Sequence, residues 1–196
     1  MKLLYVDCCI SVHEVSRTKL LADTFLNAWK ESHPEDEIEV LDLKTMDIRA
    51  LDLETLLLRE SALHAGRYDD PALTLACQFS SADRIVMAAP FWEMAFPAKL
   101  RVYIEHVSAS GIAFGYAEGG RSYGKCKADK LLYLTTAGGP IEGMNYGADY
   151  LKAICAFFGI DQFEFLGAPM QDVQEVDHEA ILRDVLAQAT ELAKTF

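Results

Sequence analysis

Short apolar runs alternate along this chain with longer segments in which apolar residues recur every three or four positions. Short runs are typical of β-strands, and the wider spacing is typical of helices that pack one face on a core. The run RIVMAAP is apolar almost throughout, as expected of a parallel strand that is covered on both faces. The predicted strands lie at 3–6, 38–43, 84–90, 131–135 and 162–167. The predicted helices lie at 17–30, 53–64, 71–80, 97–107, 146–158 and 181–192.

The order of these elements predicts the α/β fold class. Neighbouring parallel strands need long crossover connections, which helices supply with a right-handed sense. We therefore expect a doubly wound parallel sheet of five strands in the order 2-1-3-4-5, with helices on both faces. The 196 residues fit a single domain over 1–196, with one irregular excursion at 111–129 that is rich in glycine and aromatic residues.

Charge limits the partners of this protein. The chain has 18 Lys and Arg against 30 Asp and Glu, a formal net charge of -12. Such an exterior repels phosphate polymers and acidic lipid surfaces, so we expect neither nucleic acid nor a membrane as a partner. A single phosphate is still compatible with this charge, because helix N-termini and backbone N–H groups bind anions locally.

The cysteines and the first residues bear on localisation. There are five cysteines, an odd number without the paired spacing of a metal site, which suits a reducing compartment. The opening run MKLLYVDCC reaches Asp7 too soon for a secretory signal, and no apolar stretch is long enough to span a bilayer. We therefore expect a cytoplasmic protein.

The loop after the first predicted strand has features of a phosphate site. In an open α/β sheet, ligands bind outside the carboxyl ends of the strands, at the point where the strand order reverses. For the order 2-1-3-4-5 this point lies between strands one and three. This loop lacks both the GxGxxG and the GxxxxGK[ST] pattern. Ser16, Arg17 and Thr18 instead open a helix, where hydroxyls, free N–H groups and one cation can bind a terminal phosphate. The alternative is that Ser16 serves only as a helix N-cap.

The loops after the third and fourth strands favour a flat aromatic ligand. PFWEMAFP, at 90–97, places two aromatic side chains and a methionine directly after a central strand, as an isoalloxazine ring would require. TTAGG, at 135–139, allows close approach of the backbone to a flat ligand. The alternatives are that these aromatic residues belong to the core and that the two glycines form only a turn.

Together the three loops resemble those of the FMN-dependent NADH-azoreductase and quinone-reductase family of flavodoxin-like proteins. The resemblance covers most of the chain and is most specific over 89–139. Its motifs are SRT at 16–18, APFWEMAFPAKL at 89–100, YIE at 103–105, GIAFGY at 111–116, GK at 124–125 and TTAGG at 135–139.

The resemblance implies a flavodoxin-like fold and an enzyme that binds FMN. It implies hydride transfer from NADH or NADPH, followed by reduction of a small acceptor such as a quinone, an azo compound or a nitroaromatic. It also implies a homodimer, with an interface that we expect at 97–109 and 111–129, where Phe114, Tyr116 and Tyr123 lie. The predicted FMN-binding residues are Cys9, Ser11, Ser16, Arg17, Thr18, Pro90, Phe91, Trp92, Glu93, Met94, Thr136, Ala137, Gly138 and Gly139.

Two residues depart from the family pattern. Cys9 stands where a serine is usual, although Ser11 can compensate, and Glu93 stands where an asparagine is usual. No protein acid or base and no metal ligand is predicted, since hydride transfer to a flavin needs neither. The dispersed histidines form no metal motif; they are His13, His33, His64, His106 and His178. Two alternatives stay open: a flavodoxin-type electron carrier, and a non-enzymatic interaction module with a decayed site.

Overall fold

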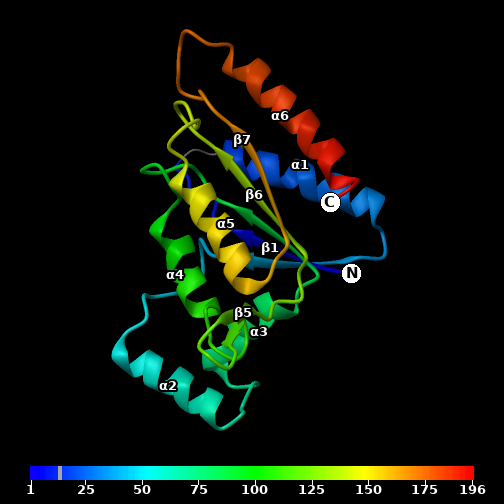
Figure 1. The fold of residues 1–196 in the computed structure, drawn as a ribbon. Coiled ribbons are helices and arrows are strands. Elements are labelled where there is room, and N and C mark those ends of the chain that lie inside the picture. Colours follow the sequence, from blue (N-terminus) through cyan, green and yellow to red (C-terminus); the bar gives the residue numbers. More distant parts are fainter. Residues whose placement is uncertain (13–14) are drawn as a thin grey trace.

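The computed structural model describes residues 1–12 and 15–196 and contains one central parallel sheet (Figure 1). The strands are β1 (Lys2–Asp7), β2 (Glu37–Asp42), β3 (Arg84–Ala88), β6 (Lys130–Thr136) and β7 (Gln162–Ala168). Their order is β2-β1-β3-β6-β7, and every neighbouring pair is parallel. The predicted fold class and strand order are therefore confirmed.

Helices cover both faces of this sheet (Figure 1). The helices of the protein are α1 (Arg17–Ser32), α2 (Leu53–His64), α3 (Thr74–Ser81), α4 (Ala98–Val107), α5 (Tyr146–Phe158) and α6 (His178–Ala193). One face packs on α1 and α6, and the other packs on α3, α4 and α5. The predicted helix 71–80 is divided into a 3-10 turn at Pro71–Leu73 and α3.

The alternation of side chains along β1 explains the two apolar layers. Leu3 and Tyr5 face α1 and α6, whereas Leu4 and Val6 face the opposite layer, and all four are buried. Successive side chains of a strand point to opposite faces, so a strand covered on both sides must be apolar throughout. This is the reason why the central strands β1, β3 and β6 appear in the sequence as nearly continuous apolar runs.

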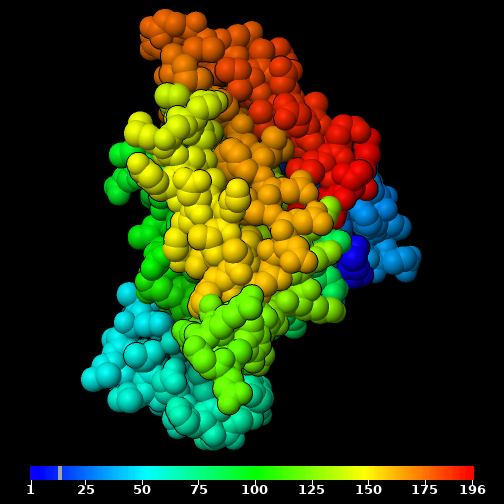
Figure 2. Space-filling model, in the orientation of Figure 1, coloured from blue at the N-terminus to red at the C-terminus, as the bar shows by residue number. Residues whose placement is uncertain are grey.

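The excursion between α4 and β6 forms a small antiparallel hairpin of β4 (Phe114–Tyr116) and β5 (Ser122–Gly124). Gly124 lies so close to the C-terminus of α5 that a Cβ there would be 2.0 Å from Gly159 N. Helix α2 stands out from the body of the protein beside this hairpin (Figure 2, cyan). Among the described residues, no helix is both long enough and apolar enough to cross a membrane.

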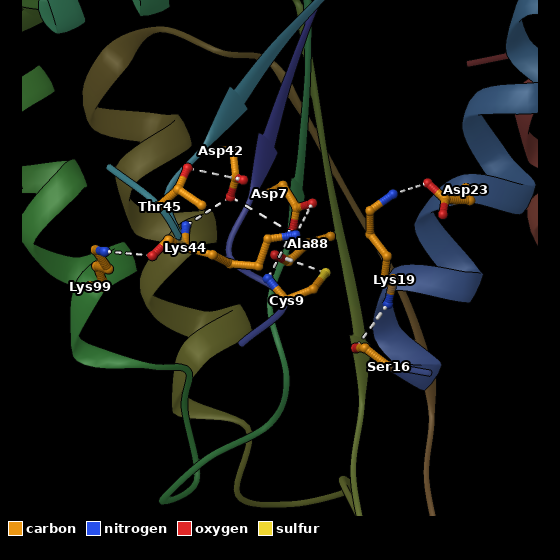
Figure 3. Close-up of polar contacts among 10 residues, drawn as sticks. All are labelled: Asp7, Cys9, Ser16, Lys19, Asp23, Asp42, Lys44, Thr45, Ala88 and Lys99. Atoms are coloured by element: carbon orange, nitrogen blue, oxygen red, sulfur yellow. Dashed lines mark hydrogen bonds and ion pairs between the residues drawn. The ribbon is translucent and has the colours of Figure 1, made fainter. Parts of the chain in front are cut away.

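A buried carboxylate stabilises the loop that follows β1 (Figure 3). Asp7 is 3% exposed, and its carboxylate accepts hydrogen bonds from the N–H of Cys9 at 2.9 Å and from Lys44 Nζ at 2.9 Å. Burial opposes ionisation of this carboxyl, but the bonds from Lys44 and Cys9 outweigh burial and leave the pKa of Asp7 below its ordinary value. Asp7 and Lys44 therefore link the loops after β1 and β2.

The loop after β3 contains a tight and strained turn. The N–H of Ala95 donates to the carbonyl of Trp92 at 2.8 Å, and the two central residues, Glu93 and Met94, have φ values of 51° and 63°. Positive φ at both central positions is the pattern of a type I′ turn, which favours asparagine and glycine. Side chains such as those of glutamate and methionine make this conformation costly.

Substitution of Lys44 by methionine is expected to destabilise the protein in a pH-dependent way. Because the pKa of Asp7 is lowered by folding, the stability from this pair is full above about pH 4 and is lost as the pH falls further. Lys44→Met should lower the free energy of unfolding at pH 7 by about 1–3 kcal/mol, since it leaves a buried carboxylate without its cation. The difference from wild type should shrink below about pH 4, as measured by urea unfolding.

The matched control is Lys194→Met, which removes an exposed ion pair with Glu191 at the end of α6. It should change the free energy of unfolding by less than about 1 kcal/mol. An equal loss of stability at pH 7 and at pH 3 in Lys44→Met would contradict the role given to Asp7.

Substitution of Glu93 by asparagine is expected to relieve strain in the turn. Asparagine tolerates positive φ better than glutamate, so Glu93→Asn should raise the free energy of unfolding by about 0.5–1 kcal/mol. Thermal or urea unfolding measures this change. Glu118→Asn is the control, because Glu118 is exposed and is not among the residues with positive φ. This substitution should leave the free energy of unfolding almost unchanged. A loss of stability in Glu93→Asn would show that the turn does not have this conformation in solution.

Candidate functional site

A pocket of about 510 Å³ lies at the carboxyl ends of β1, β3 and β6. Its volume is in the range of small-molecule and cofactor sites. The three loops singled out in the sequence meet around it, and the loop after β7 adds a fourth segment. The lining residues are Ile10, Ser11, Val12, Val15, Ser16, Arg17, Thr18, Pro90, Phe91, Trp92, Thr136, Ala137, Gly138, Gln171 and Asp172.

The N-terminus of α1 forms one wall of the pocket. Ser16 is the N-cap of this helix, and its hydroxyl accepts a hydrogen bond from the N–H of Lys19 at 3.3 Å (Figure 3). Thr18 is buried, and its hydroxyl is 2.7 Å from the hydroxyl of Thr136 at the end of β6. The first helical turn leaves N–H groups without intrahelical acceptors, and the helix dipole favours an anion there. This wall can therefore hold a phosphate.

The loop after β3 supplies the apolar part of the pocket. Pro90, Phe91 and Trp92 line it, and Trp92 is 45% exposed. The N–H of Phe91 donates to the carbonyl of Thr136 at 3.0 Å, which joins this loop to the end of β6. An exposed indole beside a strand end offers a surface on which a planar ring can stack.

Most of the residues predicted to bind FMN line this pocket. Those that line it are Ser11, Ser16, Arg17, Thr18, Pro90, Phe91, Trp92, Thr136, Ala137 and Gly138. Cys9, Glu93, Met94 and Gly139 are outside its lining. Cys9 is buried beneath the loop, with its thiol 3.7 Å from the carbonyl of Ala88, whereas Glu93 and Met94 are exposed on the strained turn.

Sequence reasoning missed Gln171 and Asp172, which follow β7. Gln171 is 2% exposed, and its side-chain oxygen has no hydrogen-bond partner among the described residues. The N–H groups of Gln171 and Asp172 donate to the carbonyls of Ala137 at 2.9 Å and Gly138 at 3.0 Å. No periodicity marks such residues, because they reach the pocket through pairing with a distant segment.

The two cysteines near the pocket, Cys8 and Cys9, are buried. Burial raises the pKa of Cys8 to about 12 and raises that of Cys9 further, with Asp7 acting in the same direction. Thiols in this state are poor nucleophiles. Among the described residues, no group of His, Cys, Asp and Glu side chains could hold a metal ion. His13 lies outside the described residues.

The residues present fit a phosphorylated, ring-bearing ligand such as FMN. The hydroxyls and N–H groups at the start of α1 suit a phosphate, and Phe91 and Trp92 suit a planar ring on the other side of the pocket. Gln171 also lines the pocket, and its side-chain oxygen is buried without a hydrogen-bond partner among the described residues. A pocket for an apolar ligand would not need these polar groups.

Relatives and solved structures agree with this arrangement. The chain is 37% identical over 200 residues to "FMN-dependent NADH:quinone oxidoreductase 2" of Clostridium acetobutylicum, and the match covers 100% of this chain and 99% of the relative. It is 36% identical to the FMN-dependent NADH:quinone oxidoreductase of Clostridium beijerinckii, with the same coverage. Each match thus extends over nearly the whole of both proteins.

Among solved structures, an azoreductase of Bacillus anthracis has the same fold, with a TM-score of 0.88 and 24% identity over 100% of this chain and 99% of that one. An FMN-dependent NADH-azoreductase of Bacillus anthracis, solved in complex with FMN, has a TM-score of 0.83 and 22% identity over 100% and 99% of the two chains. The family described as having the flavodoxin-like fold matches residues 1–192. The chain belongs to this family and, within it, to the FMN-dependent NADH:quinone oxidoreductases.

Proposed function

We propose that this protein is an FMN-dependent NADH:quinone oxidoreductase. The observation that carries the proposal is the meeting of three loops around one pocket at the carboxyl ends of β1, β3 and β6. Full-length relatives that bear this name support it. Bound FMN supplies the redox chemistry, in which a hydride is taken from the nicotinamide and two electrons pass to the acceptor.

The start of α1 holds the phosphate in this proposal. Ser16 and Thr18 contact the phosphate and the ribityl chain, with Ser11 beside them, and Arg17 adds a positive charge. The bond between the hydroxyls of Thr18 and Thr136 holds this wall against β6. Cys9 supports the loop from below, where its N–H is bonded to Asp7, and does not itself need to reach the ligand.

The loop after β3 would hold the isoalloxazine. Pro90, Phe91 and Trp92 would exclude water from the ring, and Glu93 and Met94 form the turn that follows them. The segment from Thr136 to Gly139 closes the far side. Because the turn at 92–95 is closed by its own hydrogen bond, these groups are arranged before the ligand binds.

The acceptor and the compartment are parts of the same proposal. A quinone is the acceptor named for the relatives, and azo and nitroaromatic compounds are similar planar acceptors that can stack on an exposed ring. NADH is the donor, with NADPH as a second donor to test. The five free cysteines suit the reducing cytoplasm in which we place the protein.

We also propose that the protein forms a homodimer through the hairpin of the expected 111–129 segment and through α2. The expected 97–109 segment is left out of this interface, because the buried apolar side chains of α4 (Leu100, Tyr103, Ile104 and Val107) pack in the core. Phe114, predicted as an interface residue, is 9% exposed and packs on Phe157 with ring centroids 4.4 Å apart, so it belongs to the core. Tyr116 and Tyr123 of the hairpin are 61% and 50% exposed. These two side chains are available to a second copy.

The outer face of α2 extends this surface. Leu53, Leu57 and Leu58 are 72%, 60% and 59% exposed and border a hollow of about 450 Å³. On its inner face, Ala62 belongs to the same buried cluster as Ile112 of the excursion, and α2 and the hairpin lie at one end of the molecule (Figure 2). Exposed apolar surface of this kind marks an interface, and two-fold pairing of identical surfaces is the commonest way to cover it.

The activity is tested with the purified chain and FMN. The protein should bind FMN, lose the visible flavin absorption when NADH is added without oxygen, and regain it when a quinone is added. A one-electron carrier would bind FMN without direct bleaching by NADH, and an interaction module would stay colourless. Absence of FMN binding at micromolar concentrations would disprove the proposal.

The dimer is tested by placing a charge on α2. Leu57→Glu should convert a dimer into a monomer in light scattering, because a buried carboxylate in an apolar interface has no partner. Leu20→Glu is the control, since Leu20 is 40% exposed on α1 at a distance from this surface, and it should leave the dimer intact. A wild-type monomer at assay concentration would contradict the proposed interface.

A further inference from the structure

Two opposite charges face each other across the mouth of the pocket. Arg17 is the first residue of α1, and its guanidinium is 2.7 Å from the carboxylate of Asp172, which follows β7. Among the described residues that line the pocket, Arg17 is the one cation and Asp172 the one anion. The proposed ligand carries its own negative charge on the phosphate, so the charge of Asp172 opposes that of the phosphate.

The position of Asp172 is determined by the backbone. Its N–H donates to the carbonyl of Gly138 at 3.0 Å. Two residues earlier, Met170 has a φ of 62°, and its N–H donates to the carbonyl of Gly139 at 2.9 Å. A Cβ on Gly138 would lie 2.5 Å from Asp172 Oδ2. The absence of a side chain at Gly138 therefore makes room for this carboxylate, whereas a Cβ on Gly139 would meet nothing within 4 Å.

The ion pair itself is easily broken. The Arg17 and Asp172 side chains are 39% and 71% exposed, and exposed pairs of this kind contribute little to stability because water screens them. A phosphate offers arginine a stronger, bidentate acceptor. Arg17 can therefore leave Asp172 for a phosphate that binds at the start of α1, while Asp172 stays where its backbone holds it.

We propose that Asp172 sets the affinity and selectivity of this pocket for the phosphate of its ligand. It holds Arg17 across the mouth in the absence of ligand, competes with the phosphate for the guanidinium, and repels the phosphate once it is bound. The inference rests on the proposed binding of FMN. It predicts that Asp172 weakens the binding of FMN and has no effect on riboflavin, which has the same ring and ribityl chain without the phosphate.

The experiment measures the dissociation constants of FMN and riboflavin for the full chain freed of flavin, by quenching of flavin fluorescence. Asp172→Asn should bind FMN about three- to ten-fold more tightly, because it removes a competing and repelling charge. Arg17→Gln should bind FMN about ten-fold more weakly, and the double variant should lie between the two. In all three variants the affinity for riboflavin should stay within about two-fold of the wild-type value. Retained riboflavin binding also shows that the variants fold.

The matched control is Asp23→Asn. Asp23 forms an ion pair with Lys19 on α1, outside the pocket lining, so this variant changes the net charge equally (Figure 3). It should leave FMN affinity unchanged. The inference is overturned if Asp172→Asn and Asp23→Asn shift FMN affinity equally, if Asp172→Asn weakens FMN binding, or if riboflavin shifts as much as FMN. If the wild-type chain binds neither flavin, the proposed function fails and the inference fails with it.

Discussion

Three parallel strands end at the same edge of the sheet because their hydrogen-bonded register aligns Asp7 of β1 with Ala88 of β3, and Ala88 with Leu134 of β6. Each strand must then leave the sheet by a loop on that side, and the loops meet above the point where β1 and β3 lie side by side. The pocket is a consequence of this pairing. Its shape depends on bonds between the loops, such as those from Lys44 to Asp7 and from Phe91 to Thr136.

An acidic protein can bind a phosphate because the electrostatic potential at the binding site is produced mainly by the groups close to it. The net charge of -12 is spread over the whole chain, whereas the start of α1 presents N–H groups, two hydroxyls and one guanidinium at a single point. The opposing carboxylate of Asp172 lies at the same mouth. Binding strength at such a site depends on a few nearby charges, and distant ones are screened within about 10 Å at ordinary salt.

Backbone constraints account for residues that look unsuitable in the sequence. The turn at Glu93 and Met94 has positive φ without glycine or asparagine, and so does Met170, which directly precedes the lining residues Gln171 and Asp172. Strained residues of this kind persist where surrounding contacts hold them, and they gather at ligand sites. Both strained segments are held by bonds to neighbours: Met94 accepts from the N–H of Tyr146, and Met170 donates to Gly139.

The amino-acid sequence by itself determined the layers of this fold, since the apolar runs and the helical spacing depend only on which faces are buried. It also determined the three loops, because Ser16, Phe91 and Gly138 lie within three residues of the start or end of a regular element. Only the tertiary structure decided that Cys9 is beneath the pocket, that Phe114 belongs to the core, and that Gln171 and Asp172 complete the wall. These positions depend on contacts between segments far apart in the chain, and such contacts leave no periodic signal in the sequence.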